Sequence, residues 1–404
     1  METTKIIDRP LYTDRIRPYI DKNLIKVITG QRRVGKSYIL KFIADEIKSH
    51  NPQANIITIN LEDFAFYDII DAPGLHESIK EKIIPDRKNY IFLDEIQEVK
   101  DFDKVIRSFA LDANNDLYVT GSNSAMLSSE IASRLAGRSV EIKVHPLSYN
   151  EFLRFHKRTD NEASLLDYIK YGGLPYLINL PEISAWNEYL SGITDAIVLR
   201  DIVARKLVRN TDFLQRLLLF LADNIGRIFT AKKIADYLKS QRSDLGGSIT
   251  AIQSYIQHIE EAYIINKSRR WDIQGKRFFK IGEKFFFEDT GIRNSIVGYR
   301  PGDISGLMEN IVYNHLRIHR FKVKTGSLQG GKEIDFIAER DGEIKYIQVA
   351  YTIADEATAS REYGNLENIS DNYEKFIITF NETYPNTYKG IHVISLREFL
   401  SKEL

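Results

Sequence analysis

Short apolar runs in the first third of the chain predict buried β-strands with helices between them. After the first run, apolar residues recur at the spacing of a helix that buries one face. These helical positions are Ile39, Leu40, Ile43 and Ile47. The strand-like runs are residues 24–29, 55–60, 90–93 and 117–120. Strands that alternate with helices favour a parallel sheet, so we expect an α/β domain over residues 1–150.

The pattern then becomes mainly helical. Residues 151–205 have apolar positions at helical spacing, interrupted at 171–175 by the turn residues Gly172, Gly173 and Pro175. We predict a helical segment over residues 151–210.

Residues 211–298 follow the outline of a winged helix, which is three helices followed by a β-hairpin. The first helix is predicted from the apolar period of residues 213–225. Thr230 and Ser248 are placed to cap the second and third helices. Two strand-like runs follow, at about 264–270 and 276–281.

Residues 299–404 return to a mixed pattern. A helical segment over 307–319 precedes several strand-like runs. These runs are residues 333–337, 346–352, 376–380 and 391–396. They predict a second, smaller α/β domain at the end of the chain.

Composition excludes several kinds of site. The 404 residues include no cysteine, which rules out disulfides, thiolate nucleophiles and cysteine-bound metals. The 56 basic and 56 acidic residues cancel, so any nucleic-acid contact must rest on a local patch. The chain has no apolar run long enough to span a membrane, and residues 1–10 lack a signal-peptide core. We therefore expect a cytoplasmic protein with no membrane partner.

The first strand runs directly into a phosphate-binding sequence pattern. Residues 30–37 read GQRRVGKS, followed by the helical segment described above. Two glycines let the backbone curl so that its N–H groups point at phosphate oxygens, and the helix adds its positive end. Lys36 is expected to neutralise the β and γ phosphates, and Ser37 to bind Mg²⁺. The predicted nucleotide-binding residues are Gly30, Gln31, Arg32, Arg33, Val34, Gly35, Lys36, Ser37 and Tyr38.

A second half of the same site follows the apolar run 90–93. Asp94 and Glu95 come directly after this run. An aspartate at such a strand end holds magnesium, and the adjacent glutamate is placed to polarise a water for attack on the γ phosphate. We predict Ser37 and Asp94 as metal ligands and Glu95 as the catalytic carboxylate, with Lys36 beside it.

Four further polar residues are candidates for contacts with the γ phosphate. Asn123, with Ser122, follows the strand-like run 117–120 and is a candidate sensor, or an ordinary turn residue. Arg134 and Arg138 lie near the end of a predicted helix. Either arginine can stabilise charge on the γ phosphate, in this subunit or a neighbouring one, or can simply compensate a helix dipole.

The ordered motifs resemble a known family. GQRRVGKS, YIFLDEIQEV, LYVTGSNSAML, SRLAGR and HPLSYNEF look like the bacterial and archaeal AAA+ ATPases allied to the STAND signalling ATPases. The resemblance extends over nearly the whole chain and implies ATP hydrolysis with Mg²⁺. It also implies that residues 151–210 form a helical lid beside the nucleotide and that the winged helix packs on the ATPase core as a nucleotide-sensing arm. It supplies no substrate or pathway.

The predicted hairpin is a candidate DNA-binding surface. The third predicted helix has no lysine or arginine from Ile249 to Ile264, whereas the hairpin is basic and carries Trp271, Phe278 and Phe279. Such a wing can grip a nucleic-acid backbone or stack on an unpaired base, or it can be a solvated hairpin. Its basic residues are Lys267, Arg269, Arg270, Lys276, Arg277 and Lys280.

The C-terminal domain resembles the PD-(D/E)XK nucleases in its order of elements. Glu309 lies on the predicted helix and Asp335 on the first strand. The positions of the third acid and of the lysine hold Gln348 and Ala350, which cannot do their chemistry. We expect a degenerate nuclease site at Glu309, Asp335 and Gln348, or pairing of Glu309 within the core.

These patterns together predict an ATP- and Mg²⁺-dependent ATPase. Hydrolysis would drive a conformational switch that acts on DNA or on an unknown protein partner, with an inactive nuclease-like domain. The alternative is an ATP-dependent DNA-processing enzyme with an active C-terminal nuclease. The oligomeric state stays open.

Overall fold

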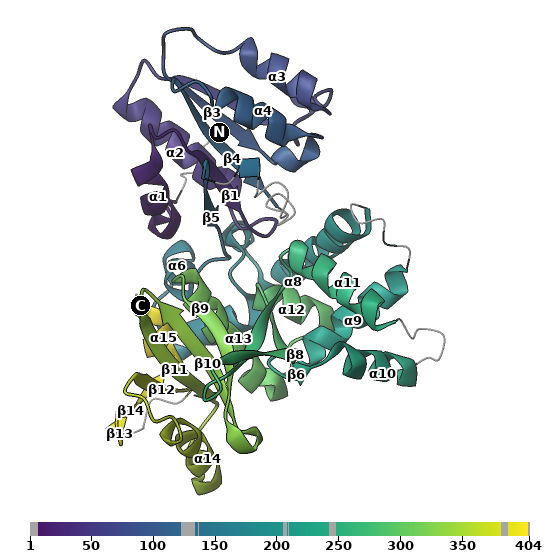
Figure 1. Ribbon diagram of the computed structural model, residues 1–404, viewed down its shortest axis with the longest axis vertical. Coiled ribbons are helices and arrows are strands. Elements are labelled where there is room, and N and C mark those ends of the chain that lie inside the picture. The colour runs from purple at the N-terminus through teal and green to yellow at the C-terminus, as the bar shows by residue number, and fades with distance from the viewer. Residues whose placement is uncertain are drawn as a thin grey trace. The chain divides into compact units, whose positions relative to one another are not determined.

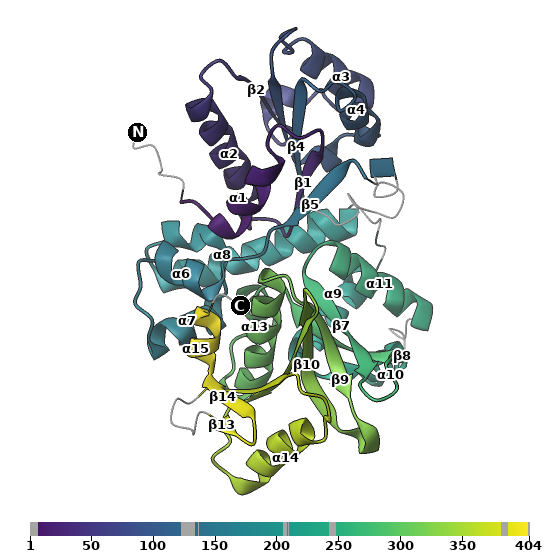
Figure 2. The ribbon, with the colours of Figure 1, turned by 60° about the vertical axis from the view of Figure 1, so that its left-hand side comes forward.

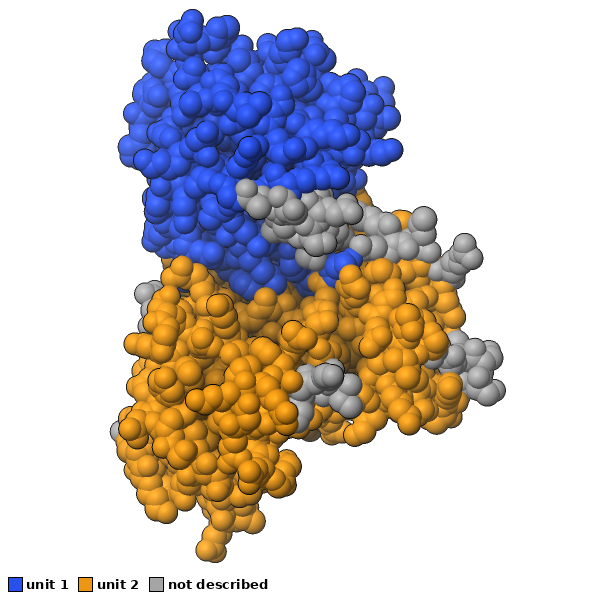
Figure 3. Space-filling model, viewed as in Figure 1, with its two compact units in different colours: residues 1–145, 261–263 blue, residues 146–260, 264–404 orange. Residues whose placement is uncertain are grey.

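The computed structural model divides the chain into two compact units. It describes residues 7–122, 134–135, 137–204, 208, 210–241, 248–380 and 387–402. Unit 1 comprises Met1–His145 and Glu261–Tyr263, and unit 2 comprises Pro146–Glu260 and Ile264–Leu404 (Figure 3). The predicted first boundary, at residue 150, lies close to this division.

Unit 1 is a parallel sheet covered by helices. Its strands lie in the order β2-β3-β4-β1-β5, and every pairing is parallel. The strands are β1 (Ile25–Thr29), β2 (Asn55–Asn60), β3 (Asn89–Asp94), β4 (Asn115–Gly121) and β5 (Ser139–Lys143). The helices are α1 (Pro10–Ile16), α2 (Lys36–His50), α3 (Ala72–Lys80) and α4 (Phe102–Phe109). This arrangement confirms the predicted α/β fold with a parallel sheet.

Burial on both faces explains why the strands read as continuous apolar runs. Strands β1, β3 and β4 are buried along their whole lengths. Helices α3 and α4 cover one side of the sheet, and α1 and α2 lie on the other (Figure 1). Leu75 of α3 and Ile106 of α4 join strand residues such as Leu93 in one core. Because all the strands are parallel, their carboxyl ends lie at the same edge of the sheet.

Unit 2 begins with the helices that the sequence predicts. The chain breaks its helical course at 172–174, as expected from the turn residues there. The helices are α6 (Tyr149–Phe155), α7 (Glu162–Tyr171), α8 (Ile183–Ala196), the π-helix η6 (Ile197–Ala204), α9 (Thr211–Asp223), α10 (Ala231–Gln241), α11 (Ile249–Glu261) and α12 (Thr290–Val297). None of the helices in the described ranges has the length and apolar character needed to cross a membrane.

A single nine-stranded sheet runs through the remainder of unit 2. Its order is β13-β14-β12-β11-β10-β9-β7-β8-β6. The strands are β6 (Ile228–Phe229), β7 (Ile265–Asp272), β8 (Arg277–Phe287), β9 (Lys322–Ser327), β10 (Glu333–Arg340), β11 (Glu343–Ala350), β12 (Glu374–Thr379), β13 (Thr387–Tyr388) and β14 (Ile391–Ser395). Helix α13 (Ile304–Ile318) packs on β9, β10 and β11, and α14 (Glu356–Glu367) packs on β10, β11 and β12 (Figure 2). Helix α15 (Leu396–Ser401) follows β14.

The predicted hairpin and the C-terminal α/β domain share this sheet. Strand β7 pairs in parallel with β9, with Trp271 opposite Gly326. A side chain at Gly326 would place its Cβ 2.8 Å from Ile334, so the close strand contact there requires glycine. The domain boundary predicted between residues 298 and 299 therefore coincides with no break in the sheet. The winged helix over 211–298 and the lid over 151–210 stay predictions, as does the nuclease-like domain over 299–404.

Asp289 joins the turn after α7 to the start of α12. Its carboxylate accepts hydrogen bonds from the backbone N–H of Gly173, at 2.7 Å, and of Ile292, at 3.0 Å. Gly172 has a φ of 72°, and a Cβ there would lie 2.2 Å from the Asp289 carboxylate. Burial raises the pKa of Asp289 to about 6, although these hydrogen bonds oppose the rise.

This raised pKa predicts a pH dependence of stability. The native state holds the Asp289 proton more tightly than the unfolded chain, so the stability it contributes is full below about pH 4 and is lost as the pH rises through about 6. We expect Asp289→Asn to reduce the decline in unfolding free energy between these values, measured by chemical denaturation at several pH values. Parallel curves for the two proteins would contradict the assignment.

Candidate nucleotide-binding site

The loop between β1 and α2 depends on two glycines, as the pattern predicts. Gly30 has a φ of 144°, and a Cβ there would lie 2.2 Å from the carbonyl oxygen of Val144. Gly35 has a φ of 95° and precedes α2 directly. Neither backbone conformation suits a residue with a side chain. The loop therefore curls tightly at the carboxyl end of β1 and presents the start of α2.

Lys36 is folded back over this loop. Its side chain is buried, and its ammonium donates to the carbonyl oxygens of Gly30 and Gln31, both at 3.1 Å. The same ammonium lies 3.6 Å from the Glu95 carboxylate. The structure thus brings the predicted phosphate-binding lysine to the predicted catalytic carboxylate.

Asp94 lies at the end of β3 and contacts two hydroxyl groups. Thr120 Oγ1, on the neighbouring strand β4, donates to Asp94 Oδ1, and Ser37 also bonds to this carboxylate. Burial raises the pKa of Asp94, although both hydroxyls and Lys36 oppose the rise. The carboxylate and the Ser37 hydroxyl, the two predicted metal ligands, are therefore adjacent oxygen donors.

Glu95 is held by contacts to its backbone and its side chain. Its φ of 54° lies in the left-handed region, and its N–H donates to Thr120 Oγ1 at 2.9 Å. Gln97 Nε2 donates to its carboxylate and lies 3.5 Å from Ser122 Oγ. Burial pushes the pKa of Glu95 upward, but the charge of Lys36 and the bond from Gln97 outweigh it, and the pKa falls below its usual range. Glu95 is therefore ionised near neutral pH.

The remaining loop residues differ in exposure. Arg32 is buried and pairs with Glu62 after β2, with 3.0 Å between the nitrogen and the oxygen. Gln31 is fully buried, and both polar atoms of its side chain lack a hydrogen-bond partner within the described part of the chain. Arg33 and Tyr38 are exposed. Val34 is fully buried, and its carbonyl oxygen accepts from Arg9 at 2.7 Å.

The four candidates for contact with the γ phosphate have different outcomes. Ser122 is buried, and its hydroxyl lies near Gln97. Asn123 lies outside the described residues. Arg134 pairs with Asp103 of α4 at 3.2 Å, and Arg138 is exposed. Their predicted roles stay predictions.

Sequence reasoning missed Thr120 and Gln97. Thr120 is the last residue of a predicted strand, so a polar residue at that end was a usable signal. Gln97 follows the acidic pair by two positions in an ordinary-looking turn. Its contact with Glu95 depends on the short 3₁₀ turn of Ile96–Glu98, for which the sequence carries no clear signal.

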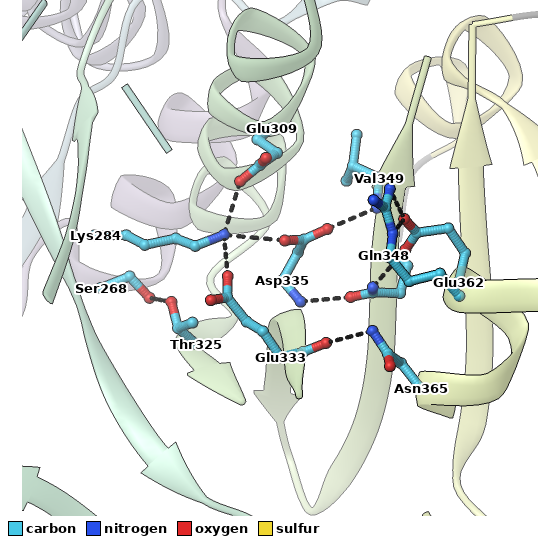
Figure 4. Close-up of polar contacts among 11 residues, drawn as sticks. Ser268, Lys284, Glu309, Thr325, Glu333, Asp335, Gln348, Val349, Glu362 and Asn365 are labelled. Atoms are coloured by element: carbon cyan, nitrogen blue, oxygen red, sulfur yellow. Dashed lines mark hydrogen bonds and ion pairs between the residues drawn. The ribbon is translucent and has the colours of Figure 1, made fainter. Parts of the chain in front are cut away.

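The C-terminal candidates meet around a lysine that the sequence prediction did not include. Lys284 of β8 contacts the carboxylates of Glu309, at 2.9 Å, and of Asp335, at 2.9 Å (Figure 4). Gln348 Oε1 accepts from the backbone N–H of Asp335 at 2.7 Å. Glu309 is thus paired within the core and also lies close to Asp335, so the degenerate nuclease site stays a prediction.

The predicted basic wing is partly engaged within unit 2. Lys267 pairs with Glu260 at 2.8 Å, and Arg270 donates to Ser327 at 3.2 Å. The side chain of Lys280 lies outside those described.

The tip of the hairpin combines cations with aromatic rings. Arg269 lies over Phe278, 5.3 Å from the ring centre, and Phe278 packs edge-on against Trp271. The side chain of Arg277 is 79% exposed, and Lys276 is exposed as well. The tip therefore offers positive charge and an aromatic surface together.

Family models match two parts of the chain. A family model described as an AAA domain matches residues 22–153, the range that contains Lys36, Asp94, Glu95 and Thr120. A second, described as a domain of unknown function (DUF8612), matches residues 162–303. The fold and these residues thus define an AAA+ P-loop ATPase domain. They support nucleotide binding by this domain.

Relatives then define the family of the whole chain. An uncharacterized protein of Haemophilus influenzae is 37% identical over 402 residues, covering 98% of each chain. Uncharacterized protein MJ1544 of Methanocaldococcus jannaschii is 30% identical over 380 residues, covering 89% of this chain and 83% of the archaeal one. The chain belongs to the family that these bacterial and archaeal proteins form.

The solved structures that the chain matches include an archaeal and a bacterial protein. The Aeropyrum pernix ORC1 protein in complex with DNA has a TM-score of 0.37 and 12% identity, covering 73% of this chain and 94% of that one. AMPPCP-bound DnaA from Aquifex aeolicus has a TM-score of 0.31 and 12% identity, covering 64% and 93%.

Proposed function

We propose that the chain binds ATP with Mg²⁺ and hydrolyses it, and that hydrolysis drives a conformational switch. The observation that carries this proposal is the meeting of Lys36, Asp94 and Glu95 at one edge of the unit 1 sheet. A cation and an ionised carboxylate there supply the two charges that phosphoryl transfer to water needs.

The oxygen donors at the end of β3 fit magnesium. Asp94 and Ser37 are adjacent, and carboxylate and hydroxyl oxygens are the ligands this hard cation prefers. Bound there, Mg²⁺ would neutralise charge on the phosphates. Lys36 would turn from the loop carbonyls to phosphate oxygens, and the buried Gln31 amide is available to a ligand atom.

Glu95 is the group proposed to polarise the attacking water. Its carboxylate is ionised, and Thr120 and Gln97 fix its position. Gln97 thus becomes a positioning residue.

Gln97→Ala is expected to shift the acid side of the pH profile of hydrolysis. Loss of its hydrogen bond raises the pKa of Glu95, so the ionised form is lost at a higher pH than in the wild type. The acid limb of the pH profile of kcat should move to higher pH, and the rate at pH values near that limb should fall several-fold. Glu98→Ala, in the same turn, serves as the control, and an unshifted limb in Gln97→Ala would contradict the role.

DNA contact through the hairpin tip is a second candidate function. The exposed charge of Arg277 beside Trp271 and Phe278 supports it, because cations contact phosphates and aromatic rings stack on unpaired bases. We expect Lys276→Ala/Arg277→Ala to weaken binding of single-stranded DNA, measured by fluorescence anisotropy. The salt dependence should fall by about 1 in log–log slope for each lost phosphate contact. Lys389→Ala, an exposed lysine elsewhere in unit 2, should leave binding unchanged, and equal slopes for the tip variant and wild type would exclude the tip.

One experiment separates the functional alternatives. Phosphate release by the wild type is measured with Mg²⁺ or with EDTA, with single-stranded DNA, duplex DNA or none, while the DNA is followed on a gel. Stimulation by DNA without cleavage supports an ATPase that acts on DNA, and indifference to DNA favours a protein partner. Cleavage that Asp335→Ala removes would support the DNA-processing enzyme with an active nuclease. Absence of Mg²⁺-dependent release under all conditions would overturn the proposed function.

A further inference from the structure

The ammonium group of Lys284 lies at the centre of three carboxylates in unit 2. Its nitrogen is 2.9 Å from Glu309, 2.5 Å from Glu333 and 2.9 Å from Asp335 (Figure 4). The lysine side chain is only 3% exposed. An ammonium has three N–H donors, and each has one carboxylate to receive it.

Three separate elements build this arrangement. Lys284 comes from β8 of the hairpin, Glu309 from α13, and the other two acids from β10. Strand β8 reaches the site because β7 pairs with both β8 and β9, and buried Ser268 and Thr325 hydrogen-bond at 2.9 Å across the β7–β9 junction. The lysine therefore holds the hairpin to the C-terminal part of the sheet.

The surrounding hydrogen bonds fix the carboxylates in place. The second oxygen of Asp335 accepts from the backbone N–H of Val349 at 3.0 Å. Gln348 accepts from the Asp335 N–H and donates to Glu362 of α14 at 2.6 Å. A glutamate at 348 would bring two carboxylates together there, so the neutral amide is the residue this network requires.

The position of Lys284 disagrees with the metal site that a nuclease of the predicted type would use. Such enzymes hold a divalent ion between carboxylates like Glu309 and Asp335. Within the described ranges, no group of three or more acidic or histidine side chains is arranged to hold a metal ion. The ammonium already stands among these oxygens, at distances of 2.5 to 2.9 Å. A divalent ion needs the same oxygens at about 2.0–2.6 Å. The two cations exclude each other.

We propose that Lys284 is the built-in cation of the cluster formed by Glu309, Glu333 and Asp335, and that it makes the C-terminal site independent of divalent metal. The pocket has a volume of about 590 Å³ and is lined by Glu309, Glu333, Asp335, Gln348 and Glu362, among others. With its cation attached to the chain, this cluster does not serve metal-dependent hydrolysis of a phosphodiester.

The electrostatics agree with a permanently charged lysine. Burial alone would lower the pKa of Lys284, but the three carboxylates outweigh it and raise that pKa well above its usual range. Removal of the ammonium leaves three partly buried carboxylates without a counter-ion, which is destabilising unless another cation enters. Lys284→Ala should therefore convert the carboxylate cluster into a site for a divalent ion.

Calcium binding tests this conversion, because Ca²⁺–oxygen distances of about 2.3–2.6 Å come closest to the observed geometry. Calorimetric titration with Ca²⁺ and thermal unfolding are measured on the nucleotide-free full chain. The wild type should show no Ca²⁺ response that depends on Asp335, as judged against Asp335→Asn. Lys284→Ala should bind Ca²⁺ and gain several degrees of thermal stability with it, and Lys284→Ala/Asp335→Asn should lose both effects.

Lys345→Ala is the matched control, because this lysine of β11 pairs with a single carboxylate, that of Glu374. It should acquire no Ca²⁺ response. A wild-type response that Asp335→Asn removes would overturn the proposal, as would a folded Lys284→Ala that ignores Ca²⁺. If Lys284→Ala folds only when Ca²⁺ is present, the proposal is supported. If it folds under neither condition, the comparison of wild type with Asp335→Asn decides.

Discussion

Lys36→Ala is expected to reduce ATP affinity by about 10- to 100-fold. A hydrogen bond to a charged group contributes about 1.5–3 kcal/mol, and each 1.4 kcal/mol corresponds to about tenfold in affinity. Lys36 is also the counter-charge of Glu95, at 3.6 Å. The variant therefore loses a phosphate contact and leaves the Glu95 carboxylate without its counter-charge. Hydrolysis should fall together with ATP binding.

Titration calorimetry with ATP and Mg²⁺ measures this effect. Lys41→Ala is a suitable control, because Lys41 lies on the same helix and is exposed. It should bind as the wild type does. Retention of wild-type affinity by Lys36→Ala would show that the loop does not hold the phosphates in the proposed way.

Glu95→Gln is expected to separate binding from hydrolysis. The amide keeps the size of the side chain but cannot polarise a water as a carboxylate does, so kcat should fall by about 10² to 10⁴. ATP affinity should change little, since Lys36 and the loop N–H groups remain. The variant should accumulate as its ATP complex.

Steady-state phosphate release and equilibrium ATP binding together test this separation. Glu98→Gln, an exposed carboxylate in the same short turn, serves as the control. Loss of both binding and hydrolysis in Glu95→Gln would indicate a structural role for Glu95. Equal turnover of Glu95→Gln and the wild type would remove Glu95 from the mechanism.

The loop and the acidic strand end were predictable because their chemistry is local. Gly30, Gly35 and Lys36 lie in one short stretch of sequence. The positive φ angles of the two glycines follow from their residue type. The Asp94–Thr120 contact instead depends on β3 pairing with β4. The apolar pattern predicted where the strands lie. Which residues of two neighbouring strands face each other depends on how the strands pair in the folded sheet.

The C-terminal cluster shows where prediction from sequence ends. Glu309, Asp335 and Gln348 were found because they match a known order of elements. Lys284 precedes them in a different predicted domain, and it reaches them only through the parallel pairing of β7 with β9. No local pattern around Lys284 distinguishes it from the other lysines of the hairpin, such as Lys267 and Lys280.

The most direct test of the central claim is a single-turnover measurement with protein in excess over radiolabelled ATP and Mg²⁺. The nucleotide that remains bound is identified over time for the wild type and for Glu95→Gln. We predict that the wild type converts bound ATP to ADP, while Glu95→Gln holds ATP intact on the same time scale. Conversion at equal rates in both proteins, or bound ATP that stays intact in the wild type, would contradict the account.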